Sequence, residues 1–186
     1  MPQKAPGDSD MSFIKAEVIR LIRRVVVPNS RILDIGCGDG KIVQQLQASF
    51  AHGIDIDQEA ITGIGDADPR ITFTVDAIEA FEPPAGQVFD YILLSGVVEQ
   101  LNDIHSVFQK LHSFAARDTR LVIVSYSRVW QPIIRFAELL KIRRKSNDEN
   151  WIPPDEIENL LAQSQFELVS RTPGILIPIR IPFLKS

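Results

Sequence analysis

Residues 31–43 constrain the fold of this chain more than any other stretch, because a short apolar run leads directly into a cluster of glycines. The apolar run covers 32–35 and carries one acidic residue, Asp34. Three glycines follow at alternate positions: Gly36, Gly38 and Gly40. An apolar helical pattern then begins at Ile42. The stretch predicts a strand, a tight turn and a helix start, with a backbone bare enough for a ligand to lie against it.

Length and charge place the chain in a broad class. Its 186 residues lie in the usual range for one domain. The net charge of −4 gives no reason to expect nucleic acid as a partner, since that usually shows as a basic excess. Cys37 is the only cysteine, so neither an internal disulfide nor a cysteine-based metal cluster can form, and no metal site is predicted. In the turn, Cys37 is interpreted as a small buried residue rather than a catalytic thiol.

The sequence predicts a cytoplasmic protein. No uninterrupted apolar stretch reaches membrane-spanning length, and no segment resembles a secretion signal. Residues 1–11 lack periodicity and are expected to form a mobile tail. Residues 12–186 are expected to form a single domain.

Strand-like runs alternate with helical patterns along the chain. The expected strands are 32–35, 53–56, 71–75, 89–94, 120–126, 166–171 and 174–183. The expected helices are 12–25 with Ser12 as N-cap, 42–46, 58–64, 104–114, 130–142 and 155–163. Several strands are apolar on both faces, which is the pattern of a parallel sheet covered on both sides by helices. The fold class is therefore α/β.

Three carboxylates lie at the ends of successive strands of this sheet: Asp34, Asp55 and Asp76. In a parallel sheet these strand ends lie along one edge, where open sheets bind their ligands. Asp55 lies 19 residues after Gly36, close to the spacing of about 20 at which an acidic side chain reaches a ribose. These positions predict a cofactor that contains adenosine.

The glycine spacing discriminates between adenosine cofactors. A dinucleotide-binding turn reads G-x-G-x-x-G, whereas this turn reads G-x-G-x-G, which disfavours a nicotinamide-dependent oxidoreductase. Asp34 beside the turn would repel a pyrophosphate but suits a ligand with an ammonium group. A P-loop is excluded, because Ile35 stands where its first glycine should be and no Ser or Thr follows Lys41.

Together these motifs resemble the class I S-adenosylmethionine-dependent methyltransferases. The matching segments are 32–40, 53–55, 75–77, 89–95 and 166–169, with Gln165 in place of a usual glycine. The resemblance implies a transferase with a Rossmann-like three-layer sandwich, whose mostly parallel seven-stranded sheet has a C-terminal antiparallel strand. It also implies S-adenosylmethionine as the methyl donor and S-adenosylhomocysteine as the product.

The resemblance implies roles for individual residues. Asp34 would orient the methionine end, Asp55 would hold the ribose, and Asp76 would accept a hydrogen bond from the adenine amino group. The glycines Gly36, Gly38 and Gly40 would let the turn backbone approach the cofactor. Ala77 and Ile78 would flank the adenine, and Ser95 would face the methionine ammonium through its backbone. Strand-end capping and turn formation is the alternative explanation for the aspartates.

The catalytic residues stay open at this point. A hydroxyl acceptor would need a base, and three candidates follow the fourth and fifth strands: Glu99, His105 and Tyr126. Each of these three residues also has an explanation that involves no catalytic role. Gln100 stands where many relatives have a histidine after the glutamate, His105 falls on a helix surface, and Tyr126 ends a core strand.

The methyl acceptor is expected to be a small molecule or a glycan. Residues 127–150 lie where such enzymes place a substrate lid, and their basic side chains fit either a phosphate-bearing acceptor or a solvated helix end. Residues 150–151 and 177–182 resemble methyltransferase domains that precede a family 2 glycosyltransferase, which would imply a saccharide acceptor and a glycosyltransferase partner domain. The alternative function is a non-catalytic cofactor-binding domain that positions or regulates a partner.

Overall fold

The computed structural model describes residues 8–65, 68–83, 86–125 and 152–172. The expected helix 130–142, the expected strand 174–183, the proposed lid at 127–150 and Tyr126 lie outside these ranges. None of the helices in the described ranges combines the length and apolarity needed to cross a membrane.

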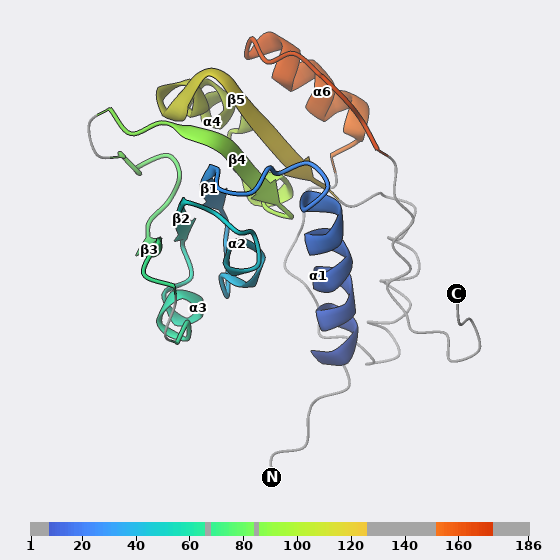
Figure 1. The fold of residues 1–186 in the computed structure, drawn as a ribbon. Helices are drawn as coiled ribbons and strands as arrows, with labels where there is room; N and C mark the ends of the chain where they lie inside the picture. The colour runs from blue at the N-terminus through green and yellow to red at the C-terminus, as the bar shows by residue number, and fades with distance from the viewer. Residues whose placement is uncertain (1–7, 66–67, 84–85, 126–151, 173–186) are drawn as a thin grey trace, which may run out of the picture.

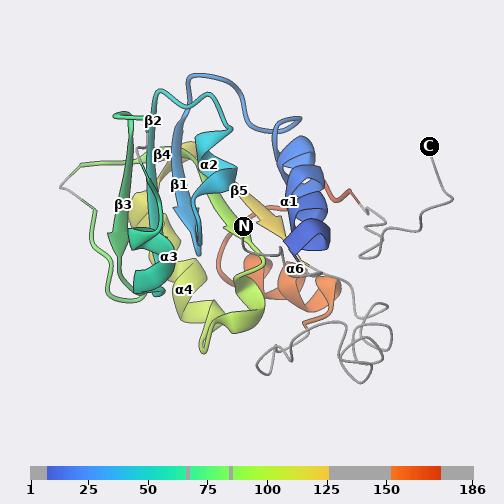
Figure 2. The same ribbon diagram turned by 90° about the horizontal axis from the view of Figure 1, so that it is seen from below.

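The described residues form one five-stranded sheet in which every neighbouring pair is parallel. Its strands are β1 (Arg31–Ile35), β2 (Phe50–Asp55), β3 (Ile71–Val75), β4 (Phe89–Ser95) and β5 (Ala115–Val124). They are ordered β3-β2-β1-β4-β5, and Figure 2 shows β3 at one edge with α1 (Asp8–Ile22) on the β5 side. The predicted parallel α/β sheet is confirmed, and β3 has the predicted bounds.

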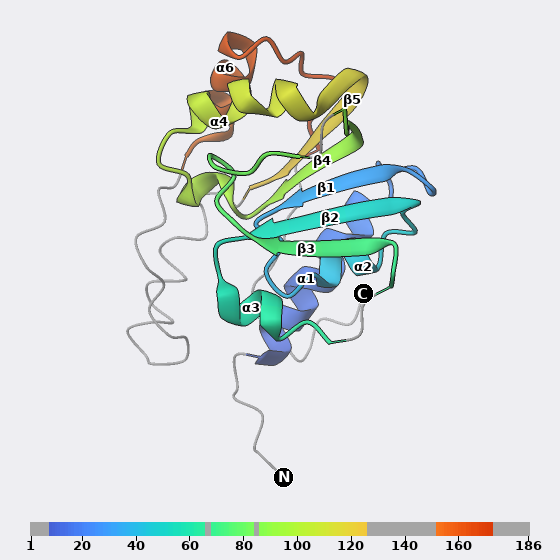
Figure 3. The same cartoon turned by 90° about the vertical axis from the view of Figure 1, so that its left-hand side faces the viewer.

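Helices cover both faces of the sheet and make three layers (Figures 1 and 3). One face carries α1 and α2 (Lys41–Gln44). The opposite face carries α4 (Ile104–Leu111), which continues as the 3-10 helix η2 (His112–Phe114), together with α6 (Pro154–Gln163). The short α3 (Gln58–Thr62) contacts β2 and β3, and the 3-10 helix η1 (Val98–Gln100) follows β4. The Rossmann-like three-layer arrangement is therefore confirmed.

Two hydrophobic clusters fill the space between the layers. The first lies under α4 and α6 and includes Phe108, Leu111 and Ile157. The second lies under α1 and α2 and includes Ile22 and Val43. Strand β1 supplies residues to both clusters, which explains why its side chains are apolar on both faces.

Helix α1 begins and ends earlier than predicted. Helix α1 begins at Asp8, so it includes the last residues of the expected tail and Ser12 is not its N-cap. Helices α3 and α4 each begin with an aspartate as N-cap. The Asp57 carboxylate accepts hydrogen bonds from the backbone of α3, and the Asp103 carboxylate accepts from both the amide and the hydroxyl of Ser106 in α4. Such caps satisfy amide groups that have no partner within the helix.

The predicted strand at 166–171 is wrong, whereas the predicted antiparallel C-terminal strand is not tested, because the last expected strand, 174–183, lies outside the described ranges. Residues 166–172 form no helix or strand and pair with no strand of the described sheet. The segment is held against α6, because the Phe166 amide donates to Leu161 and the Arg171 guanidinium pairs with Asp155 and Glu158. Five of the seven expected strands are found in the described ranges.

The strand register brings the expected site residues to one edge of the sheet. Asp34 pairs with Gly53 and with Leu93, and Asp55 pairs with Val75. Because all strands run parallel, the residues that follow β1, β2, β3 and β4 meet at the carboxyl edge.

Candidate functional site

The glycine turn after β1 is fixed against β2 by its own backbone. The amides of Gly36 and Cys37 both donate to the Ile54 carbonyl, at 2.9 and 3.1 Å. Gly36 and Gly38 have φ values of +69° and +54°, which L-residues with side chains rarely adopt. The turn therefore needs glycine to leave β1 and reach α2.

The three glycines of the turn differ in the space beside them. A Cβ on Gly36 would lie 2.7 Å from Val97, and a Cβ on Gly40 would lie 2.7 Å from Phe73. A Cβ on Gly38 would meet no atom within 4 Å. Side chains of the protein fill the space beside Gly36 and Gly40, whereas the backbone at Gly38 borders open space that can receive a ligand.

Asp34 is completely buried and lacks hydrogen-bond partners. Its side chain is 0% exposed, and both carboxylate oxygens have no donor. Burial, together with the nearby Asp55 charge, raises the pKa of Asp34 to about 7, although the ammonium of Lys15 opposes this rise. A buried ionised carboxylate without a donor is costly, so a ligand that brings a cationic or donating group to this position would be favoured.

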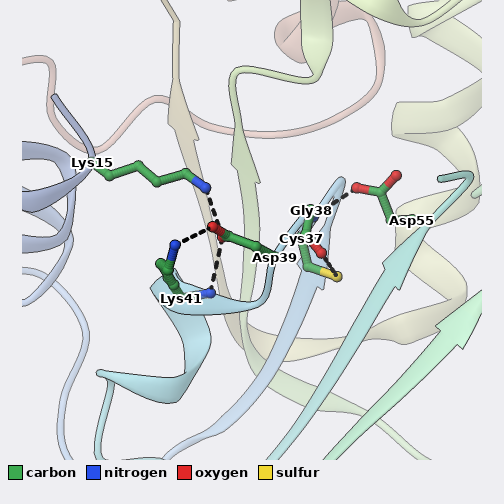
Figure 4. A network of polar contacts seen from close by, with 6 residues as sticks. All are labelled: Lys15, Cys37, Gly38, Asp39, Lys41 and Asp55. Atoms are coloured by element: carbon green, nitrogen blue, oxygen red, sulfur yellow. Dashed lines mark hydrogen bonds and ion pairs between the residues drawn. The ribbon is translucent and has the colours of Figure 1, made fainter. Parts of the chain in front are cut away.

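Asp55 ends β2 and is fixed in place by two backbone amides. Its Oδ2 accepts from the Gly38 amide at 2.7 Å, and its Oδ1 accepts from the Asp57 amide at 2.9 Å. The carboxylate therefore lies against the open part of the glycine turn (Figure 4). Each oxygen has a further lone pair that can accept from a ligand hydroxyl.

Asp76, Ala77 and Ser95 also lie at this edge, while Ile78 does not face it. The Asp76 amide donates to the Asp55 carbonyl at 3.0 Å, and an Asp76 oxygen accepts from Ala77 at 2.8 Å. Ser95 is the last residue of β4 and is half-buried. Ile78 is buried in the hydrophobic cluster under α4, so its side chain belongs to the core.

Ile56 is an edge residue that the sequence reasoning missed. It follows Asp55 directly, and its side chain is 75% exposed, far more than that of any residue in the core clusters. A large apolar side chain exposed at this edge could cover the face of an aromatic ring. The signal for it was an apolar residue immediately after an acidic strand end.

A three-residue ion network at the glycine turn was also missed. The Lys15 ammonium of α1 lies 2.6 Å from Asp39 Oδ1, and the Lys41 ammonium lies 2.8 Å from Asp39 Oδ2. The Lys41 amide also donates to Asp39 Oδ1 at 3.3 Å. Figure 4 shows Lys15 reaching the turn from α1, with Asp55 on the other side of Gly38. No local pattern in the sequence links Lys15 to the turn, because the contact is tertiary.

The structure describes two of the three catalytic candidates. Glu99 lies in η1 and is 6% exposed. Its loop contacts the glycine turn, because Val97 packs against Gly36. His105 lies in α4, and its ring nitrogens contact Ser164 Oγ at 3.1 Å and the Gln109 amide nitrogen at 2.9 Å.

Cys37 fits the interpretation as a small buried residue. Its side chain is buried, and a Cβ on Gly53 would lie 2.9 Å from its sulfur. Burial and the charges of Asp34 and Asp55 raise the pKa of its thiol. Since the thiolate is the reactive form of cysteine, this thiol is unreactive at neutral pH.

Comparison with known sequences identifies relatives. The model of a family described as a methyltransferase domain matches residues 11–171. The curated ubiquinone biosynthesis O-methyltransferase of Sinorhizobium medicae (strain WSM419) is 26% identical over 166 residues. That match covers 80% of this chain and 64% of the relative, so the chain spans less than two thirds of the relative's length.

Solved structures share the fold. The N-methyltransferase NodS from Bradyrhizobium japonicum WM9 matches with a TM-score of 0.59 at 17% identity, covering 84% of this chain and 83% of that one. The plantazolicin methyltransferase BpumL, solved in complex with SAH (S-adenosylhomocysteine), matches with a TM-score of 0.61 at 21% identity, covering 87% of this chain and 65% of that one.

Proposed function

The chain belongs to the family of class I S-adenosylmethionine-dependent methyltransferases, and on that premise we propose that it methylates a small-molecule or saccharide-type acceptor. The observation that carries the proposal is the buried Asp34 carboxylate, which has no donor in the protein and lies beside a turn that is open at Gly38. A ligand with an ammonium group would supply the missing partner.

The residues at the edge fit S-adenosylmethionine. We assign Asp34 to the ammonium of its methionine end, with the Ser95 backbone as a further contact. The turn backbone at Gly36, Gly38 and Gly40 then lies along the cofactor. The open space at Gly38 supports this placement, because the turn offers a bare peptide surface there.

We assign the adenosine end to the residues that follow β2 and β3. Asp55 would accept from the ribose hydroxyls with the lone pairs that its two amide contacts leave free. Asp76 would accept from the adenine amino group. Ala77 and the exposed Ile56 would cover the ring, which explains why an apolar side chain is exposed at this edge.

The bound cofactor supplies an activated methyl group on a sulfonium. The protein's contribution is to hold the acceptor in line with that group, which can provide roughly 7–11 kcal/mol of rate enhancement. For a hydroxyl acceptor we propose Glu99 as the base, because its loop contacts the glycine turn through Val97. His105 is a weaker candidate, since both of its ring nitrogens contact neighbouring side chains.

The acceptor class is supported by two observations of different kinds. The curated relative is named an O-methyltransferase, which agrees with a hydroxyl acceptor. The resemblance of 150–151 and 177–182 to domains that precede family 2 glycosyltransferases favours a saccharide and a glycosyltransferase partner domain. Residues 127–150 are proposed as the lid over the acceptor.

Calorimetry and a product assay test this proposal. We expect S-adenosylhomocysteine to bind more tightly than NAD, and tighter binding of NAD would overturn the cofactor assignment. We also expect release of S-adenosylhomocysteine when the protein and S-adenosylmethionine are incubated with a cell extract or a saccharide pool. Cofactor binding with no product from any acceptor pool would favour the non-catalytic cofactor-binding domain.

A further inference from the structure

The loop after β3 carries the residues that we assign to the adenine, and its residues 76–82 form no helix or strand. The backbone makes a turn here, because the Ala77 carbonyl accepts from the amides of Ala80 and Phe81 at 3.0 and 2.9 Å. The amide of Ala77 donates to Asp76 Oδ1 at 2.8 Å. The orientation of the Asp76 carboxylate therefore depends on where this turn holds Ala77.

Helix α4 holds the same turn from the side of the core. The Lys110 ammonium, in the last turn of α4, donates to the Glu79 carbonyl at 2.7 Å and pairs with Glu82 Oε1 at 3.0 Å. The Lys110 side chain is 20% exposed, whereas the Glu82 side chain is 77% exposed. Because water screens the ion pair with Glu82, the hydrogen bond to the carbonyl is the stronger restraint on the turn.

Apolar side chains on both sides of the Glu79 carbonyl do not replace this hydrogen bond. Phe81 is buried, and its ring centroid lies 5.0 Å from that of His52 and 5.8 Å from that of Phe114. Ile78 is buried in the cluster under α4, while the two residues between Ile78 and Phe81 are exposed. Packing of the flanking side chains does not set the direction of a carbonyl between them, whereas a hydrogen bond does.

We propose that Lys110 of α4 is a positioning residue for adenine recognition. By holding the Glu79 carbonyl it fixes the turn at Ala77, and the turn orients the Asp76 carboxylate toward the adenine amino group. This inference rests on the proposed function, because it concerns the adenine end of the same cofactor. Lys110 itself does not touch the ligand, so its effect on binding passes entirely through Asp76.

A cycle of two ligands and two proteins tests the inference. The ligands are S-adenosylhomocysteine and an analogue in which unsubstituted purine replaces adenine, so that the amino group is missing. The proteins are the unaltered chain and Lys110→Met, which keeps an apolar stem of similar length but cannot donate to the carbonyl. Titration calorimetry measures the dissociation constants, and thermal unfolding measures the stability of each protein.

We expect the unaltered protein to bind S-adenosylhomocysteine about 10- to 100-fold more tightly than the purine analogue, the range typical of a hydrogen bond to a charged group. Lys110→Met should weaken S-adenosylhomocysteine binding by about 3- to 10-fold and leave binding of the analogue within about twofold, so the preference for the amino group falls. Lys110→Arg should keep most of this preference, because a guanidinium can also donate to the carbonyl.

Glu82→Gln is the matched control for Lys110→Met. It removes the exposed ion pair of Lys110 and leaves the hydrogen bond to the Glu79 carbonyl in place, so the ratio of the two dissociation constants should not change. Asp76→Ala removes the proposed acceptor of the amino group. In that background, Lys110→Met should have no further effect on the ratio, because the residue through which Lys110 acts is absent.

Equal weakening of both ligands by Lys110→Met would overturn the inference, because it would show that Lys110 only supports the fold. Unchanged binding of both ligands would overturn it as well, and so would a further loss of preference in the Asp76→Ala background. Equal affinity of the unaltered protein for the two ligands would remove the Asp76 assignment and the inference with it. Failure of the unaltered protein to bind S-adenosylhomocysteine would instead contradict the proposed function, so the two failures are distinguishable.

Discussion

Two polar clusters of this molecule differ in how completely their groups are paired. The α4–α6 cluster consists of His105, Gln109, His112, Ser164 and Phe166. Within it His112 contacts the Ser164 carbonyl at 2.7 Å and stacks on the Phe166 ring at 4.4 Å, while His105 contacts Ser164 Oγ and Gln109. At the glycine turn, by contrast, the buried Asp34 carboxylate has no partner.

The difference separates a structural cluster from a binding site. Folded proteins pair their buried polar groups, and a group left unpaired requires a functional explanation. The α4–α6 cluster is complete without a ligand, and it joins two helices far from the turn in sequence. Substitutions there should affect stability, whereas substitutions at the turn should affect cofactor binding.

The largest effect on binding is expected for Gly38→Val. The new side chain would fill the open space beside the turn and would strain a backbone at φ +54°, at a cost of roughly 1–2 kcal/mol in stability. S-adenosylhomocysteine binding should fall by more than about 1,000-fold, because the ligand loses its contact surface. Calorimetry measures the affinity, and thermal unfolding measures the strain.

Gly86→Val is the matched control for that variant. Gly86 also has a positive φ, +78°, and a Cβ there would meet no atom within 4 Å, but it lies before β4 at the opposite end of the strands. We expect a similar loss of stability without a loss of binding. Normal binding by Gly38→Val would show that the ligand lies elsewhere.

Asp55→Ala should weaken S-adenosylhomocysteine binding by about 100-fold or more, because two charge-assisted hydrogen bonds to the ribose are lost. Asp57→Ala provides the comparison, since the Asp57 carboxylate caps α3 through the amides of Glu59 and Ala60. That variant should lose about 1 kcal/mol of stability and keep its affinity. Equal affinities of the two variants, measured by calorimetry, would remove the ribose assignment.

Asp34→Asn should weaken cofactor binding by about tenfold while stabilising the unliganded protein at alkaline pH. Burial raises the pKa of Asp34 from its ordinary value of 3.8 to about 7 in the folded chain. The folded state therefore holds this proton more tightly than the unfolded state. The stability that the protonated carboxyl contributes is complete below about pH 4 and is lost as the pH rises through 7.

Thermal unfolding of the two proteins between pH 4 and pH 8 tests this linkage. Relative to Asp34→Asn, the unaltered protein should lose several degrees of Tm over that range, on the scale of about 1.4 kcal/mol per unit of pKa shift. Parallel Tm curves for the two proteins would contradict it. Added S-adenosylhomocysteine should reduce the difference, because its ammonium pairs with the carboxylate.

The smallest effect on binding is expected for Ser164→Ala in the α4–α6 cluster. The variant removes a hydroxyl that is 3.1 Å from His105 Nδ1 and leaves that ring nitrogen without its partner. Stability should fall by about 1 kcal/mol, and the affinity for S-adenosylhomocysteine should stay unchanged. A clear loss of affinity in calorimetry would show that the two clusters are coupled, and the comparison would then fail.

The elements that were predicted well are those whose own residues decide their structure. Strand β3 has an alternating apolar pattern and helix α6 has a helical one, and both have a clear start. Their bounds therefore agree with the prediction to within one residue. Strand β2 begins earlier than expected, at Phe50, because pairing with β1 recruits Ala51 and His52. These residues show little strand preference by themselves, and the neighbouring strand decides their conformation.

For the segment 166–171 the error is the opposite one, because a strand was predicted where the structure has none. Its apolar pattern favours a strand, but a strand also needs a neighbour to pair with. In the structure Phe166 stacks on His112 and Arg171 pairs with α6, while Val169 is left exposed. Long-range contacts of this kind are not encoded in a short window of sequence.

The positions of the carboxylates at the edge of the sheet were predictable from the sequence, but their burial and their ionic contacts were not. Asp34, Asp55 and Asp76 follow from strand order, because parallel strands end together. The approach of Lys15 depends on how α1 packs beside the turn, and the complete burial of Asp34 depends on the packed tertiary structure. Ile56 became visible as a site residue only through its exposure.

The packing of α1 has a consequence for how the domain assembles. Val18 and Ile22 of α1 share a hydrophobic cluster with Tyr91 and Leu93 of β4, which come much later in the chain. Before β4 is synthesised the helix can pack only on earlier parts of the cluster, such as Ile32 of β1 and Val43 of α2, so a nascent chain ending ahead of Phe89 lacks part of the surface that binds α1. Since the Lys15 ammonium of α1 contacts Asp39, the packing that holds this ion pair at the glycine turn is complete only after β4 has been made, and not when the turn itself forms.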